Sequence, residues 1–270
     1  MPIMSNLGAV MRPDLNVFYV LDTSGSMRGK GIGVLNRAMD ETVDALREVT
    51  AHHGDANVKI AVLEFNSRCR WVNPDGPEYL KDFLWRDLGA AGETRVGDAL
   101  RELDSKLSRN AFLNSMTSAY LPVIIFMTDG DATDEYEPAL RHILRNRWFA
   151  KATRVGFAIG SDPNVEMIAK LVGNSEAVIR TEDLNVFAQL LRFVSVSAST
   201  LAGSSHTRDQ EVSGEEAVRM GRIMAGVTPR EVSAGINYRE PKSAHYDWSG
   251  PVSWSDEVPG LTFQNNPDDL

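Results

Sequence analysis

Short apolar runs alternate along most of the chain with longer segments whose apolar residues recur every three or four positions. The runs VFYVLD, NVKIAVLEFN, LPVIIFMTDG and TRVGFAIGS begin at Val17, Asn57, Leu121 and Thr153. Runs of this length that are apolar at every position are typical of strands buried on both faces of a parallel sheet. Their alternation with helices predicts an α/β fold, a doubly wound and mostly parallel central sheet with helices on both faces.

The segments between these runs have helical spacing. In residues 34–53, for example, Val34, Ala38, Val43 and Leu46 fall on one face, and Gly54 can end the helix. In residues 136–151, Pro138 suits the first turn of a helix. The predicted helices span residues 34–53, 94–108, 136–151, 164–173 and 184–199, and residues 78–88 form a shorter amphipathic segment.

The composition changes after residue 199. Residues 200–270 contain six Lys and Arg against eleven Asp and Glu, and they are rich in Ser, Gly and Pro. We therefore expect a domain over residues 13–199 and an acidic C-terminal extension over 200–270. One helix is predicted in the extension, in SGEEAVRMGRIMAG, where Ser213 and Glu216 fit a capping box and Gly226 fits a C-terminal stop.

The extension also carries aromatic residues, which disordered tails usually lack. They are Tyr238, Tyr246, Trp248, Trp254 and Phe263. An arm that docks on the domain or on a partner is one interpretation, and simple disorder is the other. As an acidic arm it could cap a cation site of the same chain, or it could hold a partner through its tryptophans.

The net charge excludes some classes of function. The chain has 270 residues and a formal net charge of −9 at pH 7, which disfavours nucleic acid as a partner and offers no polybasic membrane patch. We expect no membrane contact, because the apolar runs are too short to span a bilayer and the N-terminus lacks the pattern of a signal peptide. The single cysteine, Cys69, rules out an internal disulfide and indicates a cytoplasmic protein.

Oxygen-bearing side chains follow two of the predicted strands. Asp22, Ser24 and Ser26 come directly after VFYVL, and Asp129 follows the run that begins at Leu121. Thr94 precedes a predicted helix in AAGETRVGDAL. In an open parallel sheet the carboxyl ends of the strands form one ligand-binding edge. Hydroxyls and carboxylates are hard ligands, so these five side chains predict a site for Mg²⁺, or for Mn²⁺ or Ca²⁺.

Each of these residues has an alternative interpretation when it is taken alone. Ser24 and Thr94 could cap the helices that follow them, and the DG pair at Asp129 is a common turn signal. The acids Asp131, Asp134 and Glu135 could build a second metal centre, but acids also suit the start of a helix, and we favour that interpretation.

Enzymatic alternatives find less support in the sequence. GSMRGKG resembles a phosphate-binding loop, but its spacing is one residue short and Gly31 stands where a hydroxyl is needed. A metal-dependent phosphohydrolase or phosphotransferase using Asp22 is the alternative function; one such class would have a second acid where Ser24 stands. Nucleophilic catalysis by Ser24 or Ser26 lacks a candidate base.

Taken together, the motifs resemble a von Willebrand factor type A domain between about Pro13 and Ser199. DTSGSM matches the family motif D-x-S-x-S, Thr94 matches its threonine, and the acid of TDG matches its second aspartate. The resemblance implies a Rossmann-like fold with a metal-ion-dependent adhesion site, at which a partner's carboxylate completes the coordination of the cation. Glu93 stands where the family often has a glycine.

This resemblance implies a binding module rather than an enzyme, an adaptor or scaffold whose protein partner supplies an Asp or Glu. We predict Gly25, Glu93 and Asp131 as residues that face the partner. PVIIFMTDGDATDEYEPAL, RVGFAIGSD and FVSVSAS are similar to the bacterial tellurium-resistance TerY-like branch. That similarity implies a stress-response system with a protein kinase and a PP2C-like phosphatase as partners.

Overall fold

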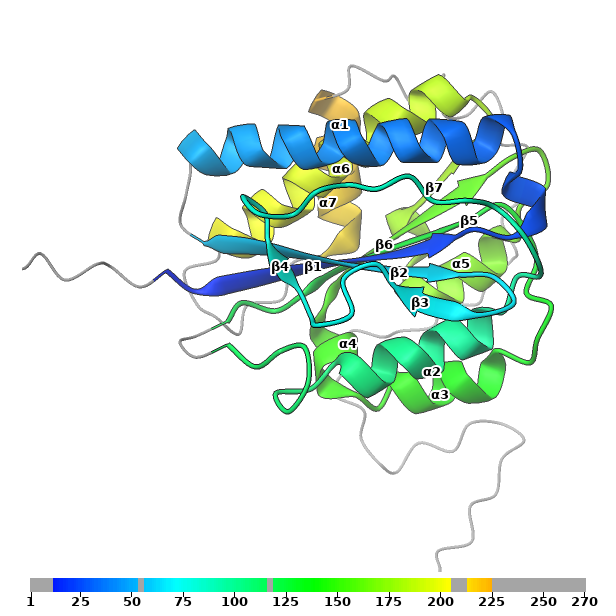
Figure 1. Cartoon of the computed structure of the whole chain (residues 1–270), viewed down its shortest axis with the longest axis horizontal. Coiled ribbons are helices and arrows are strands. Elements are labelled where there is room, and N and C mark those ends of the chain that lie inside the picture. Colours follow the sequence, from blue (N-terminus) through cyan, green and yellow to red (C-terminus); the bar gives the residue numbers. More distant parts are fainter. Residues whose placement is uncertain (1–11, 53–55, 116–118, 205–212, 225–270) are drawn as a thin grey trace, which may run out of the picture. The chain divides into compact units, whose positions relative to one another are not determined.

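One seven-stranded sheet organises the computed structural model, which describes residues 12–52, 56–115, 119–204 and 213–224 (Figure 1). The strand order is β3-β2-β1-β5-β6-β7, with β4 also paired to β2. The strands are β1 (Asp14–Asp22), β2 (Asn57–Phe65), β3 (Cys69–Trp71), β4 (Glu78–Tyr79), β5 (Val123–Thr128), β6 (Thr153–Ile159) and β7 (Val178–Thr181).

Five neighbouring strands run parallel to one another, in the order β2, β1, β5, β6 and β7. Strands β3 and β4 each pair with β2 in the antiparallel direction. From β1 the chain first adds β2 on one side and later adds β5 on the other. The direction of winding therefore reverses between β1 and β5, and their carboxyl ends form a topological switch point. The predicted mostly parallel, doubly wound α/β fold is confirmed.

Helices cover both faces of the sheet, and each layer encloses a hydrophobic core (Figure 1). Side chains alternate between the faces of a strand, so Tyr19 of β1 joins one core and Phe18 joins the other. The first core holds α1 (Lys30–His52), α6 (Leu184–Ser204) and α7 (Gly214–Met224). The second holds α2 (Val96–Lys106), α3 (Glu137–Ile143), α4 (Arg147–Lys151) and α5 (Val165–Val172). Two short 3₁₀ turns, Gly25–Met27 and Ser175–Ala177, complete the described elements.

The predicted helix over residues 136–151 is wrong in one respect, because it divides into α3 and α4. Asn146 has an extended backbone, and its side chain accepts a hydrogen bond from the Trp148 backbone N–H, which makes it the N-cap of α4. Its side-chain amide also donates to Asp104 Oδ1 at 2.8 Å, at the far end of α2. The apolar period continues through this break, so periodicity alone could not reveal it.

Beyond the boundary predicted at residue 199, the chain continues to pack against the sheet. Helix α6 extends to Ser204, and α7 contacts α6 and β6. Ser213 caps α7 by accepting a hydrogen bond from the Glu215 N–H at 3.2 Å. Ala217 and Val218 of α7 are buried. The predicted stop at Gly226 and the aromatic residues from Tyr238 onward lie outside the described residues.

Gly214 allows the close approach of α7 to the sheet. A Cβ atom at this position would lie 1.9 Å from the Arg154 carbonyl oxygen of β6. Gly214→Ala should therefore displace the start of α7 and destabilise the protein by about 1–3 kcal/mol, measured by urea unfolding. Gly33→Ala in α1 is the matched control, because a Cβ there meets no atom within 4 Å. Equal stability of Gly214→Ala and the wild type would contradict this packing.

Candidate metal centre

The two acids of the predicted site lie at the switch point of the sheet. Asp22 is the last residue of β1, and Asp129 directly follows β5. The two strands are hydrogen-bonded neighbours in which Leu21 pairs with Met127. Parallel strands in this register bring both carboxylates to one edge, as the sequence predicted.

A chain of hydroxyl groups connects this edge from Ser24 to Asp129. The Ser26 hydroxyl donates to Asp129 Oδ1 at 2.7 Å, and the Ser24 and Ser26 hydroxyl oxygens are 2.9 Å apart. A serine hydroxyl has one proton, so Ser24 is the donor to Ser26. The chain runs from a buried serine to an exposed one, and so the centre is open on the side of Ser26.

The Asp22 carboxylate is fully buried and is held by two donors. Its Oδ1 accepts from the Ser24 backbone N–H at 2.8 Å, and its Oδ2 accepts from the Thr128 hydroxyl at 2.5 Å. Thr128 was not among the predicted site residues. Its place at the last position of a fully buried strand gave a signal for burial and none for this contact.

Thr94 reaches the same edge through a loop that is tied to residues 23–25. The Ala91 N–H donates to the Thr23 carbonyl, and the Gly25 N–H donates to the Gly92 carbonyl, both at 2.9 Å. Gly92 has a φ of 82°, and a Cβ there would lie 2.4 Å from Ser67 Oγ, so only glycine fits. Thr94 itself is buried.

Burial also controls the electrostatics of the centre. It raises the pKa of Asp22 from 3.8 to about 6, against the lowering effect of the Thr128 and Ser24 hydrogen bonds. The pKa of Asp129 is also raised by burial, and the hydrogen bond from Ser26 opposes that shift. Ionisation of these two carboxylates is thus less favourable than in water, and a positive charge beside them would favour it.

The spacing of the oxygens fits a small divalent cation. In an octahedral Mg²⁺ site with bonds of about 2.1 Å, adjacent ligand oxygens are about 3.0 Å apart. The two steps of the hydroxyl chain, 2.9 and 2.7 Å, are ordinary hydrogen-bond distances, and they are close enough to that value for the same oxygens to occupy adjacent positions around a cation. Among the described residues no three His, Cys, Asp or Glu side chains gather as a metal cluster, so any cation at this edge would depend on the hydroxyls.

The other acids near the centre have different roles in the structure. Asp131 is exposed, and its Oδ1 accepts from the Asn164 amide at 2.6 Å. Glu93 is exposed on the loop that carries Thr94, and its carboxylate lies 3.9 Å from Arg95. Asp134 accepts hydrogen bonds from two backbone N–H groups at the start of α2. The last contact accounts for Asp134 without a second metal centre.

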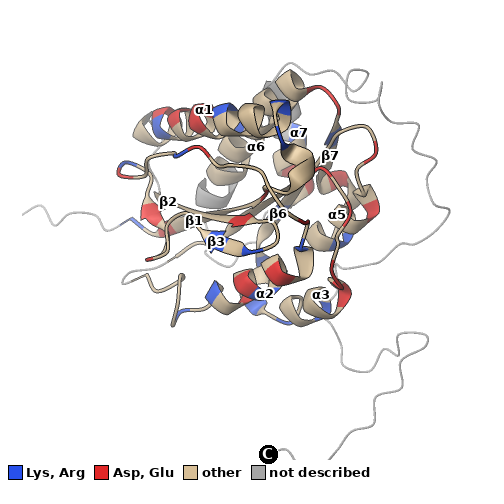
Figure 2. Ribbon diagram, turned by 45° about the vertical axis from the view of Figure 1, so that its right-hand side comes forward, with Lys and Arg blue, Asp and Glu red and all other residues tan. Residues whose placement is uncertain are grey.

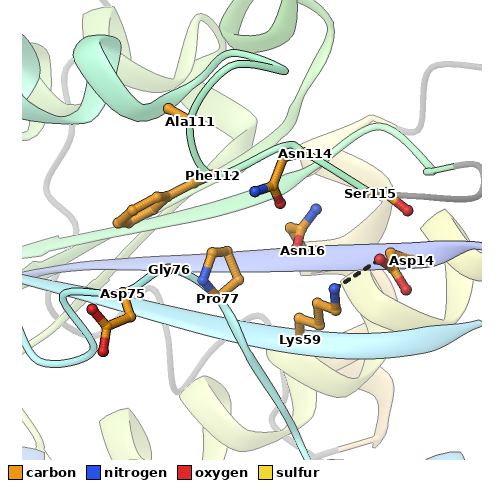
Figure 3. Close-up of a pocket in the computed structure, with 10 residues that line it drawn as sticks. All are labelled: Asp14, Asn16, Lys59, Asp75, Gly76, Pro77, Ala111, Phe112, Asn114 and Ser115. Atoms are coloured by element: carbon orange, nitrogen blue, oxygen red, sulfur yellow. Dashed lines mark ion pairs between the residues drawn. The ribbon is translucent and has the colours of Figure 1, made fainter.

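A small polar cavity of about 60 Å³ lies near the opposite ends of the strands (Figure 3). It is lined in part by Asp14 and Asn16 at the start of β1 and by Lys59 of β2. The Lys59 ammonium pairs with the Asp14 carboxylate at 2.8 Å. None of the five predicted metal-site residues lines this cavity.

Comparison with known proteins finds a family match in the part of the chain that carries the candidate centre. Residues 17–132 match the family model of the von Willebrand factor type A domain. The chain contains a von Willebrand factor type A domain. The match covers the D-x-S-x-S residues, Thr94 and Asp129.

The similar proteins include one curated relative and several solved structures. Inter-alpha-trypsin inhibitor heavy chain H3 of Bos taurus is 25% identical over 195 residues, 69% of this chain and 21% of that protein. The structure of a von Willebrand factor type A protein from Catenulispora acidiphila has 19% identity and a TM-score of 0.54, and it covers 70% of this chain and 43% of that one.

A second similar structure is that of proximal thread matrix protein 1 from the mussel byssus, which has a zinc-occupied metal-ion-dependent adhesion site. It has 16% identity and a TM-score of 0.52, and the match covers 70% of this chain and 48% of the mussel protein. The chain thus spans about a fifth of the curated relative and less than half of these two solved chains. At these identities the solved structures support the shared fold.

The raised pKa of Asp22 predicts a pH-dependent stability for the metal-free protein. Because the folded value, about 6, lies above the unfolded 3.8, ionisation of Asp22 opposes folding as the pH rises through this window. In Asp22→Asn the amide can donate to Thr128, whose hydroxyl can turn toward the Gly130 carbonyl 3.4 Å away. The variant should therefore be more stable than the wild type at pH 7 by ~1–3 kcal/mol.

The measurement is urea unfolding in EDTA between pH 4 and pH 8. The stability difference between Asp22→Asn and the wild type should shrink as the pH approaches 4, because folded Asp22 is then protonated while the unfolded carboxyl, with its pKa of 3.8, is only partly ionised. A difference that does not change with pH would show that the burial of this charge is not its cause.

Proposed function

We propose that the domain is a metal-dependent protein-interaction module, in which Asp22, Ser24, Ser26, Thr94 and Asp129 hold Mg²⁺ or a similar divalent cation, some of them through water. The observation that carries this proposal is the hydroxyl chain from Ser24 through Ser26 to Asp129, whose oxygen spacing suits an octahedral cation. The zinc-occupied adhesion site of the mussel protein, which has the same fold, supports it.

The donor set suits a partner that brings a carboxylate. Hydroxyls coordinate without neutralising charge, and only two of the five proposed ligands are acids. The cation would thus keep an affinity for a further anion. The exposed side of the centre lies at Ser26, beside the loops that carry Glu93 and Asp131. An Asp or Glu of a partner protein entering there would pair with the cation in a partly dry cleft, where such a contact is stronger than a surface salt bridge.

The alternative function, a phosphohydrolase or phosphotransferase with Asp22 as nucleophile, has less support. The Asp22 side chain is fully buried, and each of its oxygens already accepts a hydrogen bond. A nucleophile needs an oxygen that a substrate can reach. The histidine considered as a base, His142, already has a partner in the last part of α2: its Nε2 lies 3.2 Å from Asp104 Oδ2.

Three finer parts of the proposal come from the sequence. They are a place in a tellurium-resistance or stress system, a protein kinase and a PP2C-like phosphatase as partners, and the cytoplasm as location. Each stays a prediction.

None of the helices in the described part of the chain is long and apolar enough to cross a membrane. Acidic and basic side chains are mixed along α1 and α2 (Figure 2).

Calorimetric titration of Mg²⁺ and Mn²⁺ into EDTA-treated protein tests the metal centre. We expect one binding site in the wild type and its loss in Asp22→Asn and Asp129→Asn, because each variant removes one of the two ionised ligands. Asp162→Asn is the matched control, since Asp162 is an exposed acid in the loop after β6. Unchanged binding in the first two variants would place the cation elsewhere.

Partner binding should depend on the same centre. Proteins that the wild type retains in Mg²⁺ should elute with EDTA, and Asp22→Asn should not retain them. A partner that stays bound through both treatments would contradict coordination through the cation.

A further inference from the structure

The start of α2 is capped by a side chain from a distant loop. Asp134 Oδ1 accepts a hydrogen bond from the Gly97 N–H at 2.9 Å, and its Oδ2 accepts one from the Asp98 N–H at 3.0 Å. Arg95, the N-cap residue of α2, makes no side-chain capping bond. A carboxylate that binds two free N–H groups of a helix also interacts favourably with the helix dipole. The cap is thus supplied across a sequence separation of 36 or 37 residues.

The same loop also holds the backbone of Thr94. The Thr133 N–H donates to the Thr94 carbonyl oxygen at 2.9 Å. Thr94 comes two residues before α2, so this bond and the cap at Gly97 both hold the segment from Thr94 to Gly97 against residues 133–134. Close packing adds a third constraint, because a Cβ atom at Gly97 would lie 2.8 Å from the Glu135 carbonyl and 2.9 Å from Asp134 Oδ2.

Arginines balance the charge of this cap. Arg101 lies 3.8 Å from the Asp134 carboxylate, and it also pairs with Asp98 at 2.6 Å. Arg95 hydrogen-bonds to Asp98 as well. The hydrogen bonds from Arg101 and Arg95 hold the pKa of Asp98 below its usual value. The two arginines thus offset the negative charge that the carboxylates bring to the start of α2.

We propose that Asp134 is a positioning residue of the metal centre, which places the Thr94 hydroxyl for the cation by capping α2. The proposal rests on the proposed metal-binding function. It gives residues 129–134 two roles, because the segment begins with the ligand Asp129 and ends with the residue that fixes the opposite ligand. A shift of this loop would then move two ligands of the centre together.

The experiment is a double-mutant cycle on Mn²⁺ affinity, measured by electron paramagnetic resonance with the full chain. Thr94→Val and Asp134→Ala should each weaken binding about 10- to 100-fold, the usual effect of losing a residue that orients a metal ligand. The double variant should bind like Thr94→Val alone, because Asp134 acts through Thr94. Gly97→Ala, which obstructs the same contact, should weaken binding in the same way.

Asp104→Ala is the matched control. Asp104 is another acid of α2, and it accepts a hydrogen bond from Asn146, away from Thr94. Its loss should lower stability in EDTA and leave Mn²⁺ affinity unchanged. If Asp134→Ala does not fold, Asp134→Asn carries the test, since its one remaining acceptor oxygen predicts an intermediate loss of affinity.

Two results would overturn the proposal while leaving the metal centre in place. One is Mn²⁺ affinity in Asp134→Ala equal to that of the wild type. The other is an additive loss in the double variant, which would show that Asp134 acts independently of Thr94. Failure of the wild type itself to bind Mn²⁺ would instead overturn the proposed function, and this proposal with it.

Discussion

The buried carboxylate of Asp22 is the constraint on which the rest of the centre depends. A negative charge without solvent contact is costly unless hydrogen bonds and an opposite charge compensate it. The protein supplies the Ser24 N–H and the Thr128 hydroxyl as donors, and the pKa of Asp22 is still raised to about 6. The negative charge of Asp129 raises this pKa further. The unmet charge of Asp22 gives a physical reason for a cation at this edge.

The fold explains why the neighbours of Asp22 are hydroxyls and one further acid. Strand β1 ends between β2 and β5 at the switch point of the sheet, so the loop after it meets the loop after β5. The D-x-S-x-S spacing places Ser24 and Ser26 in that loop, and Ser26 reaches Asp129. The backbone bonds of Ala91 and Gly25 add the loop of Thr94. Sheet topology and three short loops thus bring together residues that are far apart in the sequence.

The sequence predicted the parts of this arrangement that have a local signature. The apolar runs located β1, β2, β5 and β6, and helical periodicity located α1, α2, α5 and α6 close to their observed bounds. Parallel pairing then required Asp22 and Asp129 to lie at the same edge. Nothing local marked the break at Asn146, because its cap uses one polar side chain within a continuous apolar period. The sequence did not reveal the helix cap by Asp134 either. An acid in the segment after TDG suits the start of the helix that follows it, whereas the N–H groups that Asp134 binds belong to α2.

Anomalous diffraction from crystals of the wild-type protein grown with Mn²⁺ would show directly whether a cation binds at this edge. We expect one strong peak at the carboxyl ends of β1 and β5, about 2.1 Å from the Ser24 and Ser26 hydroxyl oxygens. Asp129 would then lie beside the ion or be linked to it through a water. A peak at another place in the molecule, with the Ser26 hydroxyl still donating to Asp129, would contradict it.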